Sequence, residues 1–331
     1  MQIKELMKLL SGAKLVLLIC HHNADPDAIC SAYATSTLIS ELKPETRVEI
    51  SAAEGLSKLS KHLQRWIPVE LTDPPHFDQA DLLVLLDTNT LKQLGSWEEI
   101  VPKLGKPIIL IDHHAPHPET SAIASLCIAD EGVSSTCELV YRMFKEAHVA
   151  LSQTAALALF LGMAFDTRHF VIARSSAFKV VAELLEMGVS AENALSMLAL
   201  PMDTSERVAR VKAAQRLELR KVRGWLIGYS EIRSFQASAA RAFLALGVHV
   251  AVVGGEKNSA LRISLRSSQE FYEKTGVHLG RDVAKPLGEF VSGMGGGHST
   301  SAGVNGEGDL KSAFERCHAI LQGQISPFRS E

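Results

Sequence analysis

The stretch Pro107-Ile108-Ile109-Leu110-Ile111-Asp112-His113-His114 joins a short apolar run to three side chains that can bind metal ions. An apolar run of this length is typical of a strand buried inside a sheet. Similar runs at 14–19 and 81–86 lead into His21 and Asp87. Acidic and imidazole groups are costly to bury without partners. Their repeated position after buried strands therefore indicates a functional site along one edge of a sheet.

Strand-like and helix-like segments alternate along the first half of the chain, and this alternation predicts the fold class. We expect an α/β fold with a mostly parallel sheet that carries helices on both faces. In such sheets ligands bind beyond the carboxyl ends of the strands, which is where the polar residues fall. The expected strands are 14–19, 47–52, 81–86, 107–111 and, more weakly, 122–129, and the expected helices are 26–42, 134–147, 152–164 and 175–188.

The pattern changes after Gly188, and we predict three parts: a catalytic domain at 1–189, a helical linker at 190–222 and a smaller α/β domain at 223–331. Both domains have the length of ordinary globular domains. In the last part we expect strands at 225–230, 248–253 and 260–266, helices at 235–245, 281–291 and 309–322, and a glycine-rich turn at 293–297.

Composition narrows the class of substrate. The formal net charge is −3, and no long block of Lys or Arg occurs. Proteins that bind long nucleic acids usually carry a basic face, so a short anionic substrate is favoured over a long duplex. The five cysteines show no CxxC spacing, which indicates free thiols in a reducing cytoplasm. No apolar run reaches the roughly 18 residues of a membrane span, so we expect a cytoplasmic protein without membrane contact.

Residues of one chemical kind follow four of the buried elements: His21, Asp25, Asp27, Asp87, His113 and Asp166. A lone Asp or His at such a position is more often a helix cap or a solvated loop residue. Carboxylates this close together repel one another unless cations neutralise them. Oxygen and nitrogen ligands without sulfur suit manganese or magnesium and, less selectively, iron, cobalt or zinc. The set therefore predicts a metal site, although ligand chemistry alone does not select the metal.

These motifs resemble those of the DHH phosphoesterase family, named for the tripeptide seen here at 112–114. The segment 21–31 resembles the first motif of the family, Asp87-Thr88 the second and Phe165-Asp166-Thr167 the fourth. The run Gly295-Gly296-Gly297-His298, preceded by Ser264-Leu265-Arg266-Ser267, resembles the signature of the DHH-associated domain. The resemblance thus extends over nearly the whole chain.

The resemblance implies a site with two divalent ions, usually Mn²⁺, with Mg²⁺ or Co²⁺ as alternatives. One ion would be held by His21, Asp25 and Asp87, and the other by Asp27, Asp87, His113 and Asp166. Asp112 would orient an imidazole that binds a metal, and His114 would face the scissile phosphate as a catalytic group. Residues implied to bind substrate are Arg266, Gly295, Gly296, Gly297 and His298, together with Arg168, which stands where the family commonly has Gly.

Within the family the chain resembles the NrnA-type branch, which hydrolyses short oligoribonucleotides and adenosine 3′,5′-bisphosphate. The resemblance implies a phosphodiesterase or phosphatase in which two metal ions activate a water molecule. Three alternatives stay open. A RecJ-like single-strand exonuclease would need a basic channel with stacking aromatics, but only 6% of residues are aromatic. A catalytically inactive nucleic-acid-binding module usually lacks ligands that are present here. An inorganic pyrophosphatase shares the metal motifs but has a different second domain.

A homodimer is among the oligomeric states that the sequence allows.

Overall fold

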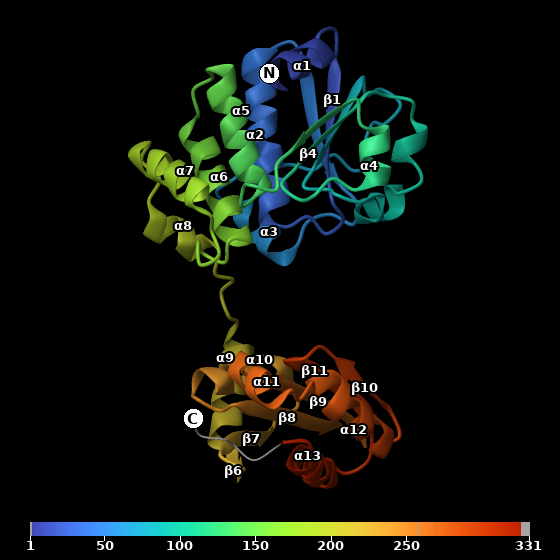
Figure 1. Cartoon of the computed structure of the whole chain (residues 1–331), viewed down its shortest axis with the longest axis vertical. Helices are drawn as coiled ribbons and strands as arrows, with labels where there is room; N and C mark the ends of the chain where they lie inside the picture. The colour runs from blue at the N-terminus through green and yellow to red at the C-terminus, as the bar shows by residue number, and fades with distance from the viewer. Residues whose placement is uncertain (1, 258, 326–331) are drawn as a thin grey trace. The chain divides into compact units, whose positions relative to one another are not determined.

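The structure is a computed structural model that describes residues 2–257 and 259–325. It comprises two compact units, Met1–Leu200 and Pro201–Glu331 (Figure 1). The segment 190–222, for which we predicted a helical linker, is divided between them. Helix α8 (Ala191–Met197) packs on α6 of the first unit, whereas α9 (Thr204–Gln215) and strand β6 (Glu218–Val222) pack in the second. Among the described residues, no helix is long and apolar enough to cross a membrane.

A five-stranded parallel sheet forms the centre of the first unit, in the order β2-β1-β3-β4-β5, so the predicted α/β class is confirmed. The strand predicted at 122–129 is shorter, because helix α4 occupies the residues up to Ile123. The strands are β1 (Leu15–Cys20), β2 (Arg47–Ala52), β3 (Leu82–Leu86), β4 (Ile108–Asp112) and β5 (Leu126–Ala129).

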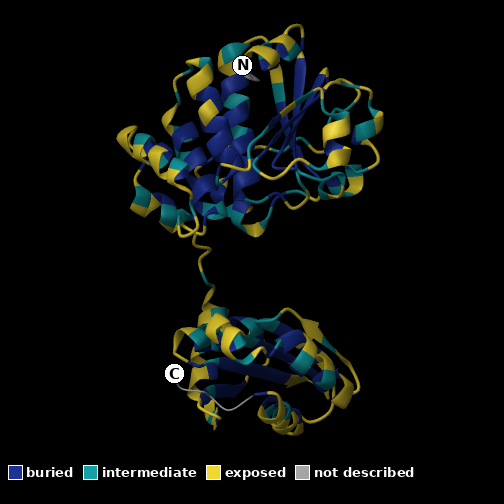
Figure 2. Ribbon diagram, viewed as in Figure 1, coloured by how far each residue is buried: buried dark blue, intermediate teal, exposed yellow. Residues whose placement is uncertain are grey.

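Helices cover both faces of this sheet, and the strands between them are buried (Figure 2). Because side chains alternate along a strand, Val16 and Leu18 pack under α2, α5 and α6, whereas Leu15 and Leu17 pack under η1, η2 and α4. The helices are α1 (Gln2–Leu10), α2 (Pro26–Leu42), α3 (Lys58–Leu63), α4 (Pro118–Ile123), α5 (Thr136–Ala147), α6 (Gln153–Asp166) and α7 (Ser175–Glu186), with short 3-10 helices η1 (Leu91–Trp97) and η2 (Val101–Lys103).

The second unit contains a six-stranded sheet in the order β10-β11-β9-β8-β7-β6. Only β7 and β8 run parallel, and helix α10 connects them. Helices α9 and α10 cover one face of the sheet, and η3, α12 and α13 pack against the other. Its further elements are β7 (Trp225–Glu231), α10 (Gln236–Ala245), β8 (Val250–Lys257), β9 (Ala260–Ser267), α11 (Gln269–Thr275), π-helical η3 (Leu279–Ala284), α12 (Lys285–Phe290), β10 (Met294–Gly297), β11 (Ser301–Glu307) and α13 (Leu310–Gln324).

The glycine-rich segment differs from our prediction. We expected a turn at 293–297, but Met294–Gly297 is an antiparallel strand paired with β11, and the turn follows it. The helix expected at 281–291 is divided into η3 and α12. Strand β11 and helices α3 and α11 were not predicted. Glycine normally weakens a strand, so the local sequence favours a turn. The segment nevertheless forms a strand, because it packs against η3 and α12.

Close packing of α2 against α6 depends on Gly162. A Cβ atom at this position would lie 2.9 Å from Oδ1 of Asp27 and 3.2 Å from its Cα, and it would also meet the Sγ of Cys137. A side chain here would therefore push apart the helices that carry Asp27 and Asp166.

Replacing Gly162 with Ala tests this packing constraint. We expect Gly162→Ala to lower the free energy of unfolding by about 1–3 kcal/mol, the usual cost of overpacking. Gly323→Ala is the matched control, because a Cβ atom added to that helical glycine would meet no atom within 4 Å. The control should retain or slightly raise stability. Equal effects of the two changes in urea denaturation would contradict the packing argument.

Candidate metal centre

The predicted ligands come together at the carboxyl ends of three neighbouring strands, β1, β3 and β4. His21 follows β1, Asp87 follows β3 and His113 follows β4, whose last residue is Asp112. Asp25 caps helix α2: its Oδ1 accepts hydrogen bonds from the backbone N–H groups of residues 27 and 28, at 3.0 and 3.1 Å. Asp27 lies in the first turn of α2, and Asp166 is the last residue of α6.

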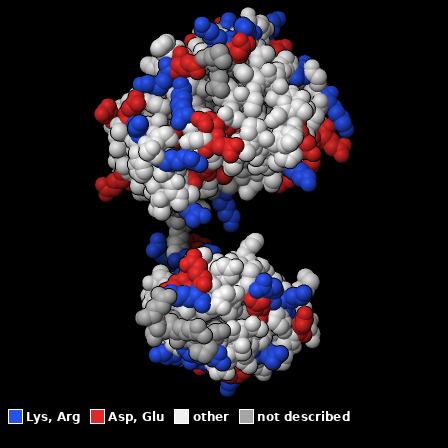
Figure 3. All heavy atoms as spheres, in the orientation of Figure 1, with Lys and Arg blue, Asp and Glu red and all other residues white. Residues whose placement is uncertain are grey.

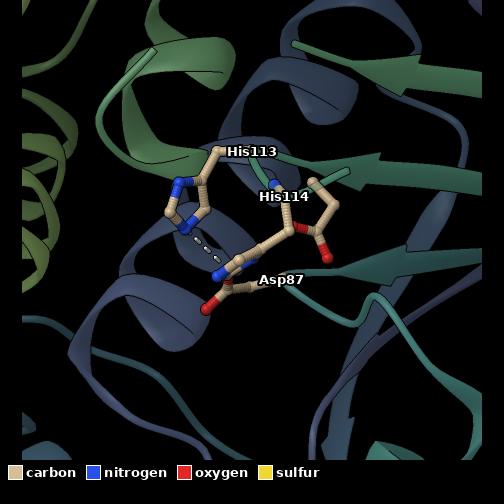
Figure 4. Close-up of side chains that lie close together, drawn as sticks. Asp87, His113 and His114 are labelled. Carbon is tan, nitrogen blue, oxygen red and sulfur yellow. Dashed lines mark hydrogen bonds and ion pairs between the residues drawn. The ribbon is translucent and has the colours of Figure 1, made fainter. Parts of the chain in front are cut away.

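Two groups of donor atoms share the Asp87 carboxylate. Figure 4 shows Asp87 beside His113 and His114. In the first group, Nε2 of His21 lies 3.7 Å from Oδ1 of Asp25 and 3.9 Å from Oδ2 of Asp87. In the second, Nε2 of His113 lies 3.7 Å from the other oxygen of Asp87, Oδ1. Each carboxylate oxygen of Asp87 therefore faces a different group.

Asp27 and Asp166 join the second group through His113, which belongs to both sets of donor atoms. Donor atoms of Asp27, His113 and Asp166 all lie within 4.8 Å of one another. The backbone of Asp87 has a φ of 52°, a left-handed conformation that is uncommon for residues other than glycine. Such conformations persist only where the surroundings hold them, often at functional sites.

Unpaired buried atoms show that these residues fit a cation. Nε2 of His113 is buried without a hydrogen bond, although Oδ2 of Asp166 lies 2.9 Å away. The two atoms are thus close but not aligned as donor and acceptor, as expected of two ligands directed at one ion. Nδ1 of His21 donates to the carbonyl of His22 at 2.8 Å, which leaves Nε2 available as a ligand. The donor set can therefore hold a divalent metal.

Charge repulsion among the carboxylates gives a second sign of a cation site. Burial, together with the charges of Asp25 and Asp166, raises the pKa of Asp87 to about 7. Burial and the charges of Asp166, Asp87 and Asp25 raise the pKa of Asp27 well above its usual range. Strongly shifted carboxylates gathered in one place are typical of functional sites. A bound cation would remove the repulsion and favour the ionised forms.

The predicted pair Asp112 and His114 is also in place. Oδ1 of Asp112 accepts hydrogen bonds from both Nδ1 and the backbone N–H of His114, each at 2.8 Å. The hydrogen bond that His114 donates to Asp112 raises the pKa of His114 to about 9, although burial partly opposes this. We predicted that Asp112 orients a metal-binding imidazole, but the imidazole that it contacts is that of His114, the predicted catalytic group. The half-exposed His114 ring keeps its Nε2 free for a ligand.

The N-terminus of α5 supports the site and was missed in the sequence. Backbone N–H groups of Thr136 and Cys137 donate to Asp27 at 2.7 and 3.1 Å, and Oγ1 of Thr136 donates to Asp87 at 2.9 Å. The sequence Ser135-Thr136-Cys137-Glu138 is a helix-start signal. It indicates where α5 begins but not which carboxylates its first N–H groups contact.

The arginine that lines a cavity beside the metal centre is Arg174, which we did not predict. Arg174 lines a cavity of about 340 Å³ together with His113, His114 and Asp166. Arg168 is exposed and is not among the residues that line this cavity. Because three consecutive left-handed residues begin at Arg168, the chain reverses direction there, which local sequence did not indicate.

The remaining predicted residues lie in the second unit. Gly295, Gly296 and Gly297 form most of β10, and the backbone N–H of His298 donates to the carbonyl of Ser301 at 2.7 Å. A side chain at Gly296 would meet no atom within 4 Å, so this position is open to a ligand. Arg266 is paired with Ser301 across the sheet, so Arg266 and His298 occur at the same end of β9 and β11.

Comparison with known proteins agrees with this arrangement. The N-terminal domain of the DHH family matches residues 15–163. An uncharacterized protein of Methanocaldococcus jannaschii is 32% identical over 307 residues, which cover 91% of this chain and 90% of that protein. A crystal structure of an exopolyphosphatase-related protein from Bacteroides fragilis superposes with a TM-score of 0.64 at 21% identity, covering 97% of this chain and 96% of the other.

Relatives with named activities match a smaller share of the chain. A probable manganese-dependent inorganic pyrophosphatase of Bacillus cytotoxicus is 30% identical over 57% of this chain and 61% of its own length. The bifunctional oligoribonuclease and PAP phosphatase NrnA of Bacillus subtilis is 25% identical over 59% of this chain and 60% of its own length.

The chain belongs to the DHH family. The named relatives in this family hydrolyse phosphate esters and related phosphates, and the chain is a hydrolase of this kind.

The role assigned to Thr136 can be tested with two substitutions. We expect Thr136→Val to weaken Mn²⁺ binding about 10–100-fold, the usual effect of removing a group that positions a metal ligand. Thr136→Ser retains the hydroxyl and should bind Mn²⁺ nearly as well as the wild-type protein. Isothermal titration with Mn²⁺ measures both affinities, and equal affinities of the Val and Ser variants would refute the role of Oγ1.

Proposed function

We propose that the protein is a manganese-dependent phosphoesterase that hydrolyses short oligonucleotides, including dinucleotides, and adenosine 3′,5′-bisphosphate. Two Mn²⁺ ions would be held on either side of Asp87, one by His21 and Asp25 and the other by the second donor group. The observation that carries the proposal is the division of the two Asp87 oxygens between these groups. Bound metals of this kind lower the pKa of a water molecule and neutralise charge on a phosphoryl group.

The chain supplies the remaining groups of the reaction. His114, held by Asp112 and with a raised pKa, is a protonated donor near neutral pH and can hydrogen-bond a phosphoryl oxygen or protonate the leaving oxygen. Arg174 adds a positive charge beside the same cavity and can stabilise the charge that develops on phosphate. In the second unit, Arg266 and the open backbone at Gly296 offer groups that can bind a phosphate.

Charge distribution supports a short substrate. The net charge is −3, and basic and acidic residues are interspersed on the surface seen in Figure 3. A nuclease that follows a long single strand combines a positively charged groove with stacking aromatics. The relative named NrnA acts as an oligoribonuclease and PAP phosphatase, which agrees with this substrate class.

Pyrophosphate hydrolysis is the second candidate, because a probable manganese-dependent inorganic pyrophosphatase is 30% identical over 200 residues. Both reactions use a metal centre, so the centre alone does not separate them.

A substrate panel with Mn²⁺ tests the proposed function. We expect turnover of adenosine 3′,5′-bisphosphate and dinucleotides, with kcat/KM falling steeply as the oligonucleotide is lengthened to a decanucleotide. His114→Ala should lower kcat by about 10²–10⁴-fold, the usual contribution of a general acid, without loss of Mn²⁺ binding. His22→Ala is the control, because His22 is exposed and bonded to the carbonyl of Gln93.

Two results would contradict the proposal. Exclusive turnover of pyrophosphate would replace it with the second candidate. Efficient turnover of long single strands, without preference for short ones, would favour a RecJ-like exonuclease.

A further inference from the structure

The second unit contains a cavity of about 460 Å³ that shares no residue with the metal centre or with the glycine strand β10. It is lined by the loop 233–236, the end of β8, the start of β9 and the end of β11. Strands β7 and β8 run parallel and are joined by α10, so the cavity lies at their carboxyl ends. This is the usual ligand position in parallel strand–helix–strand units, and the volume is typical of small-molecule sites.

Positive charge is concentrated around this cavity. Arg233, Lys257 and Arg262 line it, and Glu256 is the single acidic residue among its lining groups. None of these three cations forms a salt bridge with an acidic side chain in the described part of the chain. Unpaired arginines beside a cavity are suited to phosphate, because the guanidinium group donates two parallel hydrogen bonds. The excess of positive charge contrasts with the negative net charge of the whole protein.

A second cavity continues this basic surface. It has a volume of about 820 Å³ and shares Arg233 and Ser234 with the first. Lys212 of α9 and Arg216, which caps the C-terminus of that helix, line it, with Glu231 as its acidic residue. The two cavities together therefore present five basic residues and two acidic ones around the loop that precedes α10.

Phe235 gives the first cavity an aromatic wall. Its side chain remains 36% exposed and its backbone is left-handed, with a φ of 62°. This conformation is a clear outlier for a bulky residue and is more easily adopted by glycine. Phe235 also precedes α10 without forming a side-chain cap. Neither the folding of α10 nor the hydrophobic core accounts for an exposed ring in a strained position, and such strain is often retained for function.

We propose that this cavity is a nucleotide-binding site, in which Arg233 and Arg262 hold a phosphate group and Phe235 stacks on a base. Asn305, which also lines the cavity, offers an amide to the edge of the base. The combination of cations with an exposed aromatic ring favours a nucleotide over a simple anion. The proposal goes beyond phosphoester hydrolysis, because it concerns binding to a site without metal ligands.

The site is separate from the substrate-binding groups predicted at Arg266 and His298. Arg262 and Arg266 lie on the same face of β9 but four residues apart, which corresponds to about 13 Å along a strand. Arg262 is near the start of the strand, where Arg233 and Phe235 meet it, and Arg266 is near its end. A nucleotide held at one position therefore leaves the other available.

Titration of the full-length protein with adenosine 5′-monophosphate in the presence of a metal chelator tests the proposal. The chelator prevents turnover, so the result does not depend on whether the proposed hydrolysis is correct. We expect saturable binding by calorimetry that the double variant Arg233→Ala/Arg262→Ala weakens by roughly tenfold or more. Lys221→Ala/Lys311→Ala is the control, because it removes the same charge from exposed positions elsewhere on this unit.

The variant Phe235→Gly distinguishes a role of the Phe235 ring in nucleotide binding from a role in folding. It relieves the left-handed strain, so the melting temperature should remain equal or rise. The affinity for adenosine 5′-monophosphate should nevertheless fall by about fivefold or more, as expected for the loss of one stacked base. Inorganic phosphate should bind more weakly than the nucleotide.

Several outcomes would overturn the proposal. They are the absence of nucleotide binding to the wild-type protein, equal binding of phosphate and nucleotide, or undiminished binding by the Arg233→Ala/Arg262→Ala variant. Loss of binding in Arg266→Ala, with full binding in the double variant, would place the nucleotide at the glycine strand instead.

Discussion

Four carboxylates lie close together at one edge of the parallel sheet and repel one another. The surrounding structure of the first unit has to stabilise this cluster. Asp25 and Asp27 lie at the start of α2, Asp87 directly follows β3, and Asp166 ends α6. The order of the strands brings these positions together. Their mutual repulsion and burial disfavour ionisation, so the metal-free protein holds protons on Asp27 and Asp87 at a pH where free Asp is ionised. A folded-state pKa above the unfolded value makes the metal-free protein less stable as the pH rises from about 4 to 7.

The rest of the first unit offsets this unfavourable cluster. The apolar sheet, packed on both faces, supplies the hydrophobic stabilisation. The N-terminus of α5 contributes hydrogen bonds from Thr136 and Cys137, where the positive end of the helix dipole favours a negative charge. Gly162 allows α6 to approach α2 closely enough for Asp166 and Asp27 to share a site. The close packing of α2 against α6 is therefore also what assembles the metal centre.

Much of this arrangement could be predicted from the sequence, because it depends on local patterns. Helix α2 begins at Pro26 and ends at Leu42 as expected, since Asp25 is a capping residue and Pro26 suits the first turn. The six ligands were predicted because they follow buried elements, and the structure brings all six together.

Features that depend on tertiary contacts could not be predicted. The hydrogen bonds of Thr136 join positions 109 and 49 residues apart in the chain. The strand at Met294–Gly297 forms against η3 and α12, although its glycines favour a turn. Arg174 lines the cavity beside the metal centre, after the chain has turned through three left-handed residues that follow α6. Phe235 adopts a conformation that its own propensity disfavours.

Asp87 would hold both divalent ions, and the number of Mn²⁺ ions bound per chain is the measurement that checks this. We expect the wild-type protein to bind two ions after equilibration with Mn²⁺ and removal of excess metal, measured by elemental analysis. Asp87→Ala should lose both ions and retain its fold. Binding of a single ion by the wild-type protein, or of the full complement by Asp87→Ala, would refute the site with two ions.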